Sequence, residues 1–411
     1  PTFSPTDLTV ASIAYDKGSA TLHYTGTCKA QNPSSTRMAF AGSINSELSP
    51  FTNSFQVLNP PALRGWTVDA RGIAVTRAGL VVLAGCNPER DAGYEGTPGT
   101  SRCNENADPP EVCNWRECLI YFSASLLDSS PYVRTIKPSS DNADVLPSSI
   151  APSSHTVSGR EFIYVAVNTA GSYGNGPSLL PRAATAGGGG GGVGAVVQKI
   201  GTQERPGFTG EEGTEAGEGE DAIVIGGDYG DTNAEYVNVN KKIVKGEQER
   251  EELDVYVTGN SNGWVDSSPF SFNPGNLPQG FIGRFSGVSL SGSSYGSVVR
   301  QFPGNGFPGN GVTSVVGYAL TRDTTIRDIE DAKEGTMKVV AYGDTTGTMD
   351  YPGCKSSGKK DIFFLVMNEP DLVVDTFGRS NTCTQLGGSG NDSGAKGGIF
   401  GQTNNGEVRI V

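Results

Sequence analysis

The chain has 411 residues, 58 of them glycine and 24 proline, and a formal net charge of −13 at pH 7. This acidic balance excludes a large basic surface of the kind that nucleic acids bind, so nucleic acid is not an expected partner. No apolar run in the sequence approaches the roughly 18 residues of a membrane-spanning helix.

Only 18% of the residues are charged, and the abundance of glycine, serine, threonine and valine leaves little material for long helices. The composition therefore predicts an all-β protein. The one helix-like segment is Lys241–Leu253, which is charged nearly throughout. We expect it to be a solvated insert or an irregular connector.

Short apolar strands recur along the whole chain. Residues Thr6–Thr25 alternate apolar and polar side chains around Asp16–Gly18, which predicts a hairpin. Strands that end like Tyr-Val-Thr-Gly follow at Met38–Ser43, Leu80–Cys86, Phe162–Asn168, Asp254–Asn260, Lys338–Asp344 and, cut short, Glu407–Val411. Other apolar strands interleave with them at Phe55–Leu58, Cys118–Ser123, Gly194–Ile200, Gly280–Phe285 and Asp361–Asn368.

Recurrence of this kind is typical of radially repeated sheets. A single four-stranded sheet cannot cover both of its faces, so such sheets stack to form a core. The pattern predicts one β-propeller domain over residues 1–411, with about six blades and five or seven as alternatives. We expect residues 8–24 to pair with residues 407–411 and close the ring.

Three segments resemble a known repeat. They are Asp361–Asn368, the turn Gly387–Asp392 and the strand Asp254–Asn260. They are similar to the Asp-Ala-Phe-Val-Ala-Lys-Leu strand, the Gly-Gly-Ser-Gly-x-Asp turn and the Gly-Asn-Val-Tyr-Val-Thr-Gly strand of the SBBP β-propeller repeat family. The resemblance is clearest over residues 250–411. It implies a propeller fold and, by itself, no reaction.

The chain has seven cysteines, and four of them fall in a polar segment that cannot hold a shape by burial. Disulfides are the expected reason for order in this segment, Cys86–Cys118. Zinc is the weaker alternative, because the segment contains no histidine and no Cys-x-x-Cys spacing. The expected disulfide cysteines are Cys86, Cys103, Cys113, Cys118, Cys354 and Cys383, with a plausible bridge between the last two. Cys28 would be a free thiol or a bridge to another chain. Disulfides imply an oxidising compartment, hence a secreted or cell-surface protein.

Long insertions interrupt the strands. Residues 86–118 form the cysteine-rich insertion and residues 183–221 a glycine-rich and acidic one, and 128–158 is rich in serine and proline. All three are typical of surface loops. The six glycines at 187–192 could instead pack closely against another chain.

No convincing catalytic group is visible. His23 and His155 have no evident partner, and Gly292–Gly296 matches the nucleophile-elbow pattern without a following helix. Cofactors are therefore not expected. Calcium could bind at Asp228–Asn233 or Asp344–Asp350, although both segments are more typical of strand-capping turns.

Some side chains could mediate recognition. Asn391 lies in an Asn-x-Ser sequon and could carry a glycan. Trp66, Trp115 and Trp264 could stack on sugars or contact a partner, or be buried beneath the loops.

Together these features favour a non-enzymatic extracellular structural or adhesive protein. It would be a propeller subunit of a cell-surface or fibrous assembly that contacts other protein chains, itself included, or glycans. The alternatives are a carbohydrate-active enzyme with carboxylates at the propeller mouth and a ligand-binding receptor ectodomain.

Overall fold

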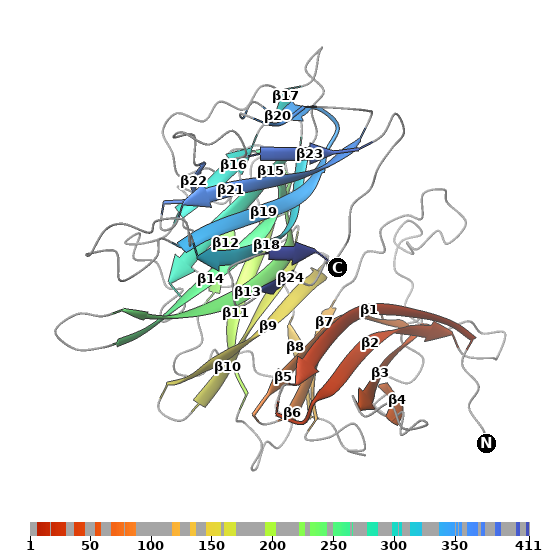
Figure 1. Ribbon diagram of the computed structural model, residues 1–411. Helices are drawn as coiled ribbons and strands as arrows, with labels where there is room; N and C mark the ends of the chain where they lie inside the picture. Colours follow the sequence, from red (N-terminus) through yellow and green to blue (C-terminus); the bar gives the residue numbers. More distant parts are fainter. Residues whose placement is uncertain are drawn as a thin grey trace, which may run out of the picture. The chain divides into compact units, whose positions relative to one another are not determined.

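The computed structural model is all-β in the residues it describes (Figure 1), which confirms the predicted fold class. No helix in this part of the chain is long and apolar enough to cross a membrane. The described residues are 6–16, 18–29, 37–45, 54–58, 67–77, 79–87, 117–123, 132–136, 145–157, 160–169, 194–202, 222–226, 231–244, 250–263, 265, 278–286, 298–302, 304–305, 313–322, 337–349, 351, 353–355, 360–368, 371–374, 383–387, 400–402 and 408–410.

The chain divides into two compact units, residues 1–176 with 196–223 and residues 177–195 with 224–411. The expectation of a single propeller domain over residues 1–411 stays a prediction.

The first unit contains three four-stranded sheets, each a meander of consecutive strands. The first sheet contains β1 (Thr6–Asp16), β2 (Thr21–Lys29), β3 (Arg37–Asn45) and β4 (Ser54–Leu58). The second contains β5 (Thr67–Thr76), β6 (Gly79–Asn87), β7 (Glu117–Ser123) and β8 (Tyr132–Ile136). The third contains β9 (Val145–Val157), β10 (Arg160–Thr169), β11 (Gly194–Gly201) and β12 (Ala222–Ile225).

The second unit contains two larger sheets and two small ones. The fourth sheet contains β13 (Thr232–Val244), β14 (Arg250–Ser261), β15 (Gln279–Ser286) and β16 (Val298–Phe302). The fifth contains β18 (Thr313–Arg322), β19 (Met337–Thr345), β21 (Asp361–Asn368), β22 (Val373–Val374) and β23 (Cys383–Leu386). The two-stranded sheets pair β17 (Gly304–Asn305) with β20 (Thr348–Met349) and β24 (Phe400–Gln402) with β25 (Val408–Ile410).

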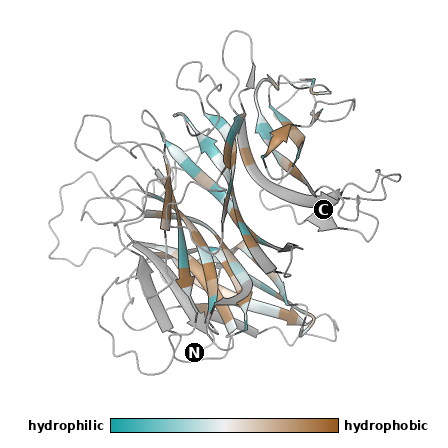
Figure 2. Cartoon of the chain, turned by 90° about the vertical axis from the view of Figure 1, so that its left-hand side faces the viewer, coloured by the Kyte–Doolittle hydropathy of each residue, from teal (hydrophilic) through white to brown (hydrophobic). Residues whose placement is uncertain are grey.

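The apolar runs singled out in the sequence are strands in the structure, from Met38–Ser43 in β3 to Asp361–Asn368 in β21. Hydrophobic and hydrophilic segments alternate along the described strands (Figure 2). The predicted ladder between the first residues and residues 407–411 is not among the described pairings, because β1 pairs with β2 and β25 pairs with β24.

The interpretation of Lys241–Leu253 as an insert or connector was wrong. Residues 241–244 continue β13 and residues 250–253 begin β14, with Lys241 opposite Leu253 and Lys242 opposite Glu252, and residues 245–249 lie outside the described residues. The antiparallel ladder that starts at Thr232 and Ser261 runs on to the pair Val244 and Arg250. A ladder already in register therefore overrides the low strand propensity of its charged residues.

The serine- and proline-rich segment 128–158 was wrongly predicted to be a loop. It contains β8 and the thirteen-residue β9, which includes Pro147 and Pro152. The order of the third sheet, β12-β11-β10-β9, makes β9 an edge strand. Proline is tolerated at a sheet edge because its missing N–H has no ladder partner to lose.

The same one-residue β-bulge recurs between the first and second strands of the five larger sheets. The extra residues on the first strands are Ala11, Arg71, Ser148, Glu235 and Val316. The residues just before the bulges face Gly26, Ala84, Val167, Gly259 and Gly343 on the second strands. Five sheets of different sequence that share one irregular register are copies of one structural repeat.

This register corrects one assignment. The sequence pattern predicts that Met38–Ser43 is the first copy of the strand Asp254–Asn260, but Gly259 corresponds to Gly26. The equivalent strand is therefore β2, with its Tyr24-Thr25-Gly26 triplet. Met38–Ser43 lies in β3, the third strand of its sheet.

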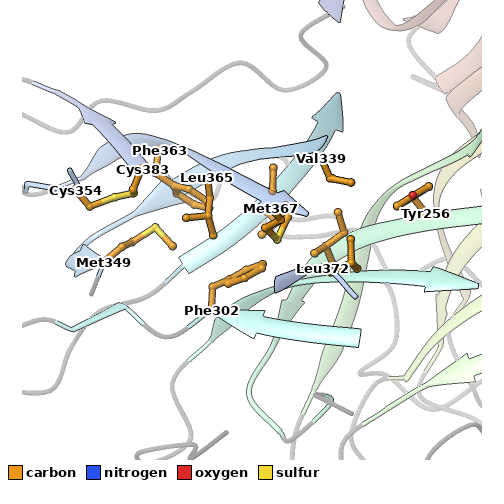
Figure 3. Packing of buried hydrophobic residues seen from close by; sticks show 13 residues of the cluster. Tyr256, Phe302, Val339, Met349, Cys354, Phe363, Leu365, Met367, Leu372 and Cys383 are labelled. Atoms are coloured by element: carbon orange, nitrogen blue, oxygen red, sulfur yellow. A yellow bond between two sulfur atoms is a disulfide. The ribbon is translucent and has the colours of Figure 1, made fainter. Parts of the chain in front are cut away.

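Neighbouring sheets of each unit pack through apolar side chains. In the first unit, Ala39, Ala41 and Leu58 form one cluster with Val68, Ala70 and Ile73 of β5. In the second unit, Tyr256 and Phe302 pack against the fifth sheet (Figure 3). The side chains that the fifth sheet contributes include Val315, Val339, Phe363, Leu365 and Met367.

A polar corner recurs in the fourth and fifth sheets. The Gln301 amide donates to Gly263 O at 2.8 Å, and the Gln385 amide donates to Gly347 O at 2.9 Å. Each glycine N–H donates, at 3.1 Å, to a hydroxyl two residues earlier, Ser261 in one sheet and Thr345 in the other. The corner ties the end of the second strand to the outer strand of the same sheet.

Candidate interaction surface

Exposed large apolar side chains are concentrated on two of the sheets. The most exposed ones in the described residues are Leu8, Val10, Ile13, Tyr15, Val373 and Leu386. The first four lie on β1, in the first sheet, and the other two lie on β22 and β23, in the fifth. These exposures range from 41% for Ile13 to 56% for Val10, so none of the six is a core residue.

The four residues of β1, here called the β1 row, share one face. Val10 is opposite Gly26, Ile13 is opposite Tyr24 and Tyr15 is opposite Leu22. Because the bulge at Ala11 shifts the alternation by one residue, side chains at 8, 10, 13 and 15 all project to the same side. The result is an uncharged apolar strip on an edge strand.

The equivalent row of β5 is buried. By register, Val68, Ala70, Ile73 and Val75 correspond to Leu8, Val10, Ile13 and Tyr15. Three of these β5 side chains are buried and Val75 is partly buried in the cluster that joins the second sheet to the first. The β5 row therefore packs the second sheet against the first.

In β9 and β18, the first strands of the third and fifth sheets, residues at equivalent positions are also buried. Ile150 of β9, equivalent to Ile13, is buried, and its Cγ2 lies 2.7 Å from the place where a Cβ on Gly72 of β5 would be. Val315 of β18, equivalent to Val10, is fully buried in the cluster with Tyr256 of the fourth sheet. In β5, β9 and β18 this row contacts the preceding sheet, whereas no sheet precedes β1 in the described residues.

The fifth sheet exposes the complementary face. Alternate residues of β21 are buried against the fourth sheet, among them Phe363 and Leu365. The intervening residues, Ile362, Phe364 and Val366, are half-buried on the other face.

Both exposed residues of the fifth sheet belong to this second face. Leu386 is opposite Ile362, and Val373 is opposite Asn368. We call Ile362, Phe364, Val366, Val373 and Leu386 the β21 face. It corresponds to the face of the first sheet, with Ala39 and Ala41, on which the β5 row packs.

Sequence reasoning did not identify either surface, although one signal was present. The triplets Ser12-Ile13-Ala14, Gly72-Ile73-Ala74, Ser149-Ile150-Ala151 and Gly317-Tyr318-Ala319 all follow the bulge. If these triplets are treated as one repeated element, β1, β5, β9 and β18 align with one another.

The buried carboxylates of the described residues have structural partners. Asp69 accepts a hydrogen bond from Thr27 of the first sheet and pairs with Arg71 at 2.8 Å. Asp254 lies 3.8 Å from Arg284 of the neighbouring strand. Asp361 accepts from the Gln385 amide at 3.0 Å. These contacts hold strands and sheets together.

Glu161 also joins two sheets. Its Oε2 accepts from the backbone N–H of Arg77, in the turn after β5, at 2.8 Å. Burial raises the pKa of this carboxyl, and the backbone N–H and the charge of Arg77 oppose that shift.

The two histidines give no catalytic arrangement. His23 is half-buried on β2, its Nδ1 has no hydrogen-bond partner, and burial lowers its pKa. The side chain of His155 and the segment Gly292–Gly296 lie outside the described residues.

The candidate calcium segments are only partly described. Asp344 pairs with Lys360 at 3.0 Å, and Thr345 caps the following turn through Gly347. Asp228 and Asp350 lie outside the described residues. No cluster of three or more His, Cys, Asp or Glu side chains suited to a metal occurs where the structure is described.

The structure joins Cys354 and Cys383 in a disulfide, as the sequence suggested, with Cα atoms 5.1 Å apart (Figure 3). Cys28 is a free thiol with no exposed surface, and its Sγ donates to Met38 O at 3.5 Å. Burial raises the pKa of this thiol, so its position favours a free thiol over a bridge to another chain.

The remaining sequence-based sites lie largely outside the described residues. Cys103, Cys113, Asn391, the three tryptophans and the glycines at 187–192 are not described, nor are the side chains of Cys86 and Cys118. The same holds for the insertions 86–118 and 183–221, apart from the strand residues at their ends and β11.

The comparisons with known proteins place the chain in no family. No family model matches it. No curated protein matches it either.

Proposed function

We propose that this chain is a non-enzymatic extracellular structural or adhesive protein, a subunit of a cell-surface or fibrous assembly that acts through contacts with other protein chains or with glycans. The observation that carries the proposal is the placement of the exposed large apolar side chains. They lie on the β1 row and on the β21 face, which are surfaces of the kind that bury one sheet against another.

The repeated sheets would be blades of a β-propeller of about six blades, as the resemblance to the SBBP repeat implies. The shared bulge supports a repeat, and the packing of the β5 row on the first sheet supports stacking of consecutive blades. If the stack closes into a ring, the first and last blades cover each other; if it does not close, each leaves one apolar face uncovered unless another sheet packs there.

The extracellular location is proposed from the cysteines. The disulfide Cys354–Cys383 closes a separation of 29 residues, and such bonds persist in oxidising compartments. The expected bridges among Cys86, Cys103, Cys113 and Cys118 would stabilise the polar insertion in the same way.

Purified full-length chain, examined by light scattering after size-exclusion chromatography and by negative-stain microscopy, tests this function. We expect oligomers whose mass grows with protein concentration. A strictly monomeric chain at all concentrations, or one that hydrolyses glycosides, would overturn the proposal.

A further inference from the structure

We propose that the β1 row of one copy of this chain docks on the β21 face of a second copy, so that copies join head to tail. This inference rests on the proposed function and names the partner in the assembly. Both surfaces are apolar, and their outermost side chains are exposed in the single chain. We assign one occupant to each surface, the other surface supplied by a neighbouring copy, in place of closure of the stack within one chain.

The first argument is continuity with an interface that the chain already contains. The β5 row packs on Ala39 and Ala41, residues of the third strand of the preceding sheet. The β1 row is the register equivalent of the β5 row, and the β21 face presents the outward residues of the third strand of the fifth sheet. The proposed contact repeats the geometry of an internal one between two copies.

The second argument is chemical. Between Leu8 and Tyr15 strand β1 carries no charged residue. Asp16, at its end, is engaged in its own turn, where it accepts from Gly18 N at 2.8 Å and from the Ser19 hydroxyl at 2.6 Å. An uncharged apolar strip does not suit nucleic acid or an acidic ligand, and it suits another apolar sheet face.

The contact is heterologous, because it joins two different surfaces. Such contacts form open chains or closed rings and have no built-in stop at the dimer. A fibrous assembly requires a contact of this open-ended kind. A two-fold contact of β1 with β1 would instead stop at a dimer.

Lysine substitutions test each surface separately. Val10→Lys with Ile13→Lys blocks the β1 row, and Leu386→Lys with Val373→Lys blocks the β21 face. Burying an unpaired ammonium in an apolar contact is costly, so each double variant should weaken self-association by at least about tenfold. Thr9→Lys is the matched control, since Thr9 is exposed on the opposite side of β1. Unchanged circular dichroism of every variant would show that the fold is retained.

Mixing the two double variants gives the decisive result. Each variant alone should be monomeric. The mixture should form a one-to-one dimer and nothing larger, because one intact β1 row meets one intact β21 face and both remaining surfaces are blocked. Sedimentation velocity measures these masses.

Three other outcomes overturn the inference. Oligomers that persist in both double variants would show that the chain assembles through another surface, which leaves the proposed function standing. Loss of association only in the β1 variant would indicate a β1–β1 contact. A wild-type chain that stays monomeric would refute the inference and the proposed function together, and would indicate that the two surfaces are covered within one chain.

Discussion

Gly26 and Gly259 occupy the same position in two different sheets. Each lies on the second strand, opposite the residue that precedes a β-bulge on the first strand. A Cβ on Gly26 would lie 1.9 Å from Thr9 O, and a Cβ on Gly259 would lie 1.9 Å from Asn233 O. Since Thr9 and Asn233 are also equivalent by register, the backbone approach itself is part of the repeat.

Alanine at either glycine should therefore destabilise the protein. A Cβ so close to a carbonyl oxygen forces the backbone of the bulge to move, which costs about 1–3 kcal/mol or more. Gly226→Ala is the control, because a Cβ there meets nothing within 4 Å and should change stability by less than about 0.5 kcal/mol. Urea unfolding checks the prediction, and equal midpoints for all three variants would contradict it.

The glutamine corners should be equivalent in stability as well as in geometry. Gln301→Ala leaves the N–H of Val265 and the carbonyl of Gly263 without their side-chain partner. Loss of such buried hydrogen bonds costs about 1–3 kcal/mol. Gln385→Ala should cost a similar amount at Gly347. Thermal unfolding of the two variants is the measurement, and a destabilisation confined to one of them would refute the equivalence.

Glu161 should make stability depend on pH. Burial is the main cause of its raised pKa, so the folded state holds the carboxyl proton more tightly than the unfolded state. The free energy of unfolding should then decrease as the pH rises from the ordinary value near 4.5 through the raised folded pKa.

Glu161→Gln removes this titration while keeping an oxygen that can accept from Arg77 N. The melting temperature of the variant, relative to wild type, should therefore be higher at pH 7 than at pH 4. Parallel pH profiles for the two proteins would rule out this role for Glu161.

The disulfide should contribute substantially to stability. Cys354 and Cys383 are 29 residues apart, and the entropy of closing a loop of that length in the unfolded chain corresponds to about 3–4 kcal/mol. The double substitution to alanine should lower the urea midpoint without changing the secondary structure. An unchanged midpoint would mean that the bond does not constrain the unfolded chain.

The positions of most strands could be predicted from the sequence, because runs such as Asp361–Asn368 are rich in β-forming apolar side chains and are bounded by turn residues. Two strand segments could not be predicted. Residues 241–244 and 250–253 are strand because the ladder from Thr232 and Ser261 is already in register, and β9 can be a strand because proline is tolerated at a sheet edge. Neither the register of a ladder nor the position of a strand at a sheet edge can be predicted from local composition.

The interaction surface could not be predicted for a related reason. Ile13 and Ile73 follow the same bulge and occupy the same position on their strands. One is 41% exposed and the other 4%. Among the described residues a preceding sheet packs on the row of Ile73 and none packs on the row of Ile13, which is a property of the stack and not of the strand.

Hydrogen–deuterium exchange of the full chain as a function of protein concentration tests the central claim most directly. If the β1 row and the β21 face bind each other between copies, the amides of β1 and β23 should exchange more slowly as the concentration rises. Amides of β6, in the middle of the second sheet, should not change. Exchange in β1 and β23 that is the same at every concentration would contradict the account.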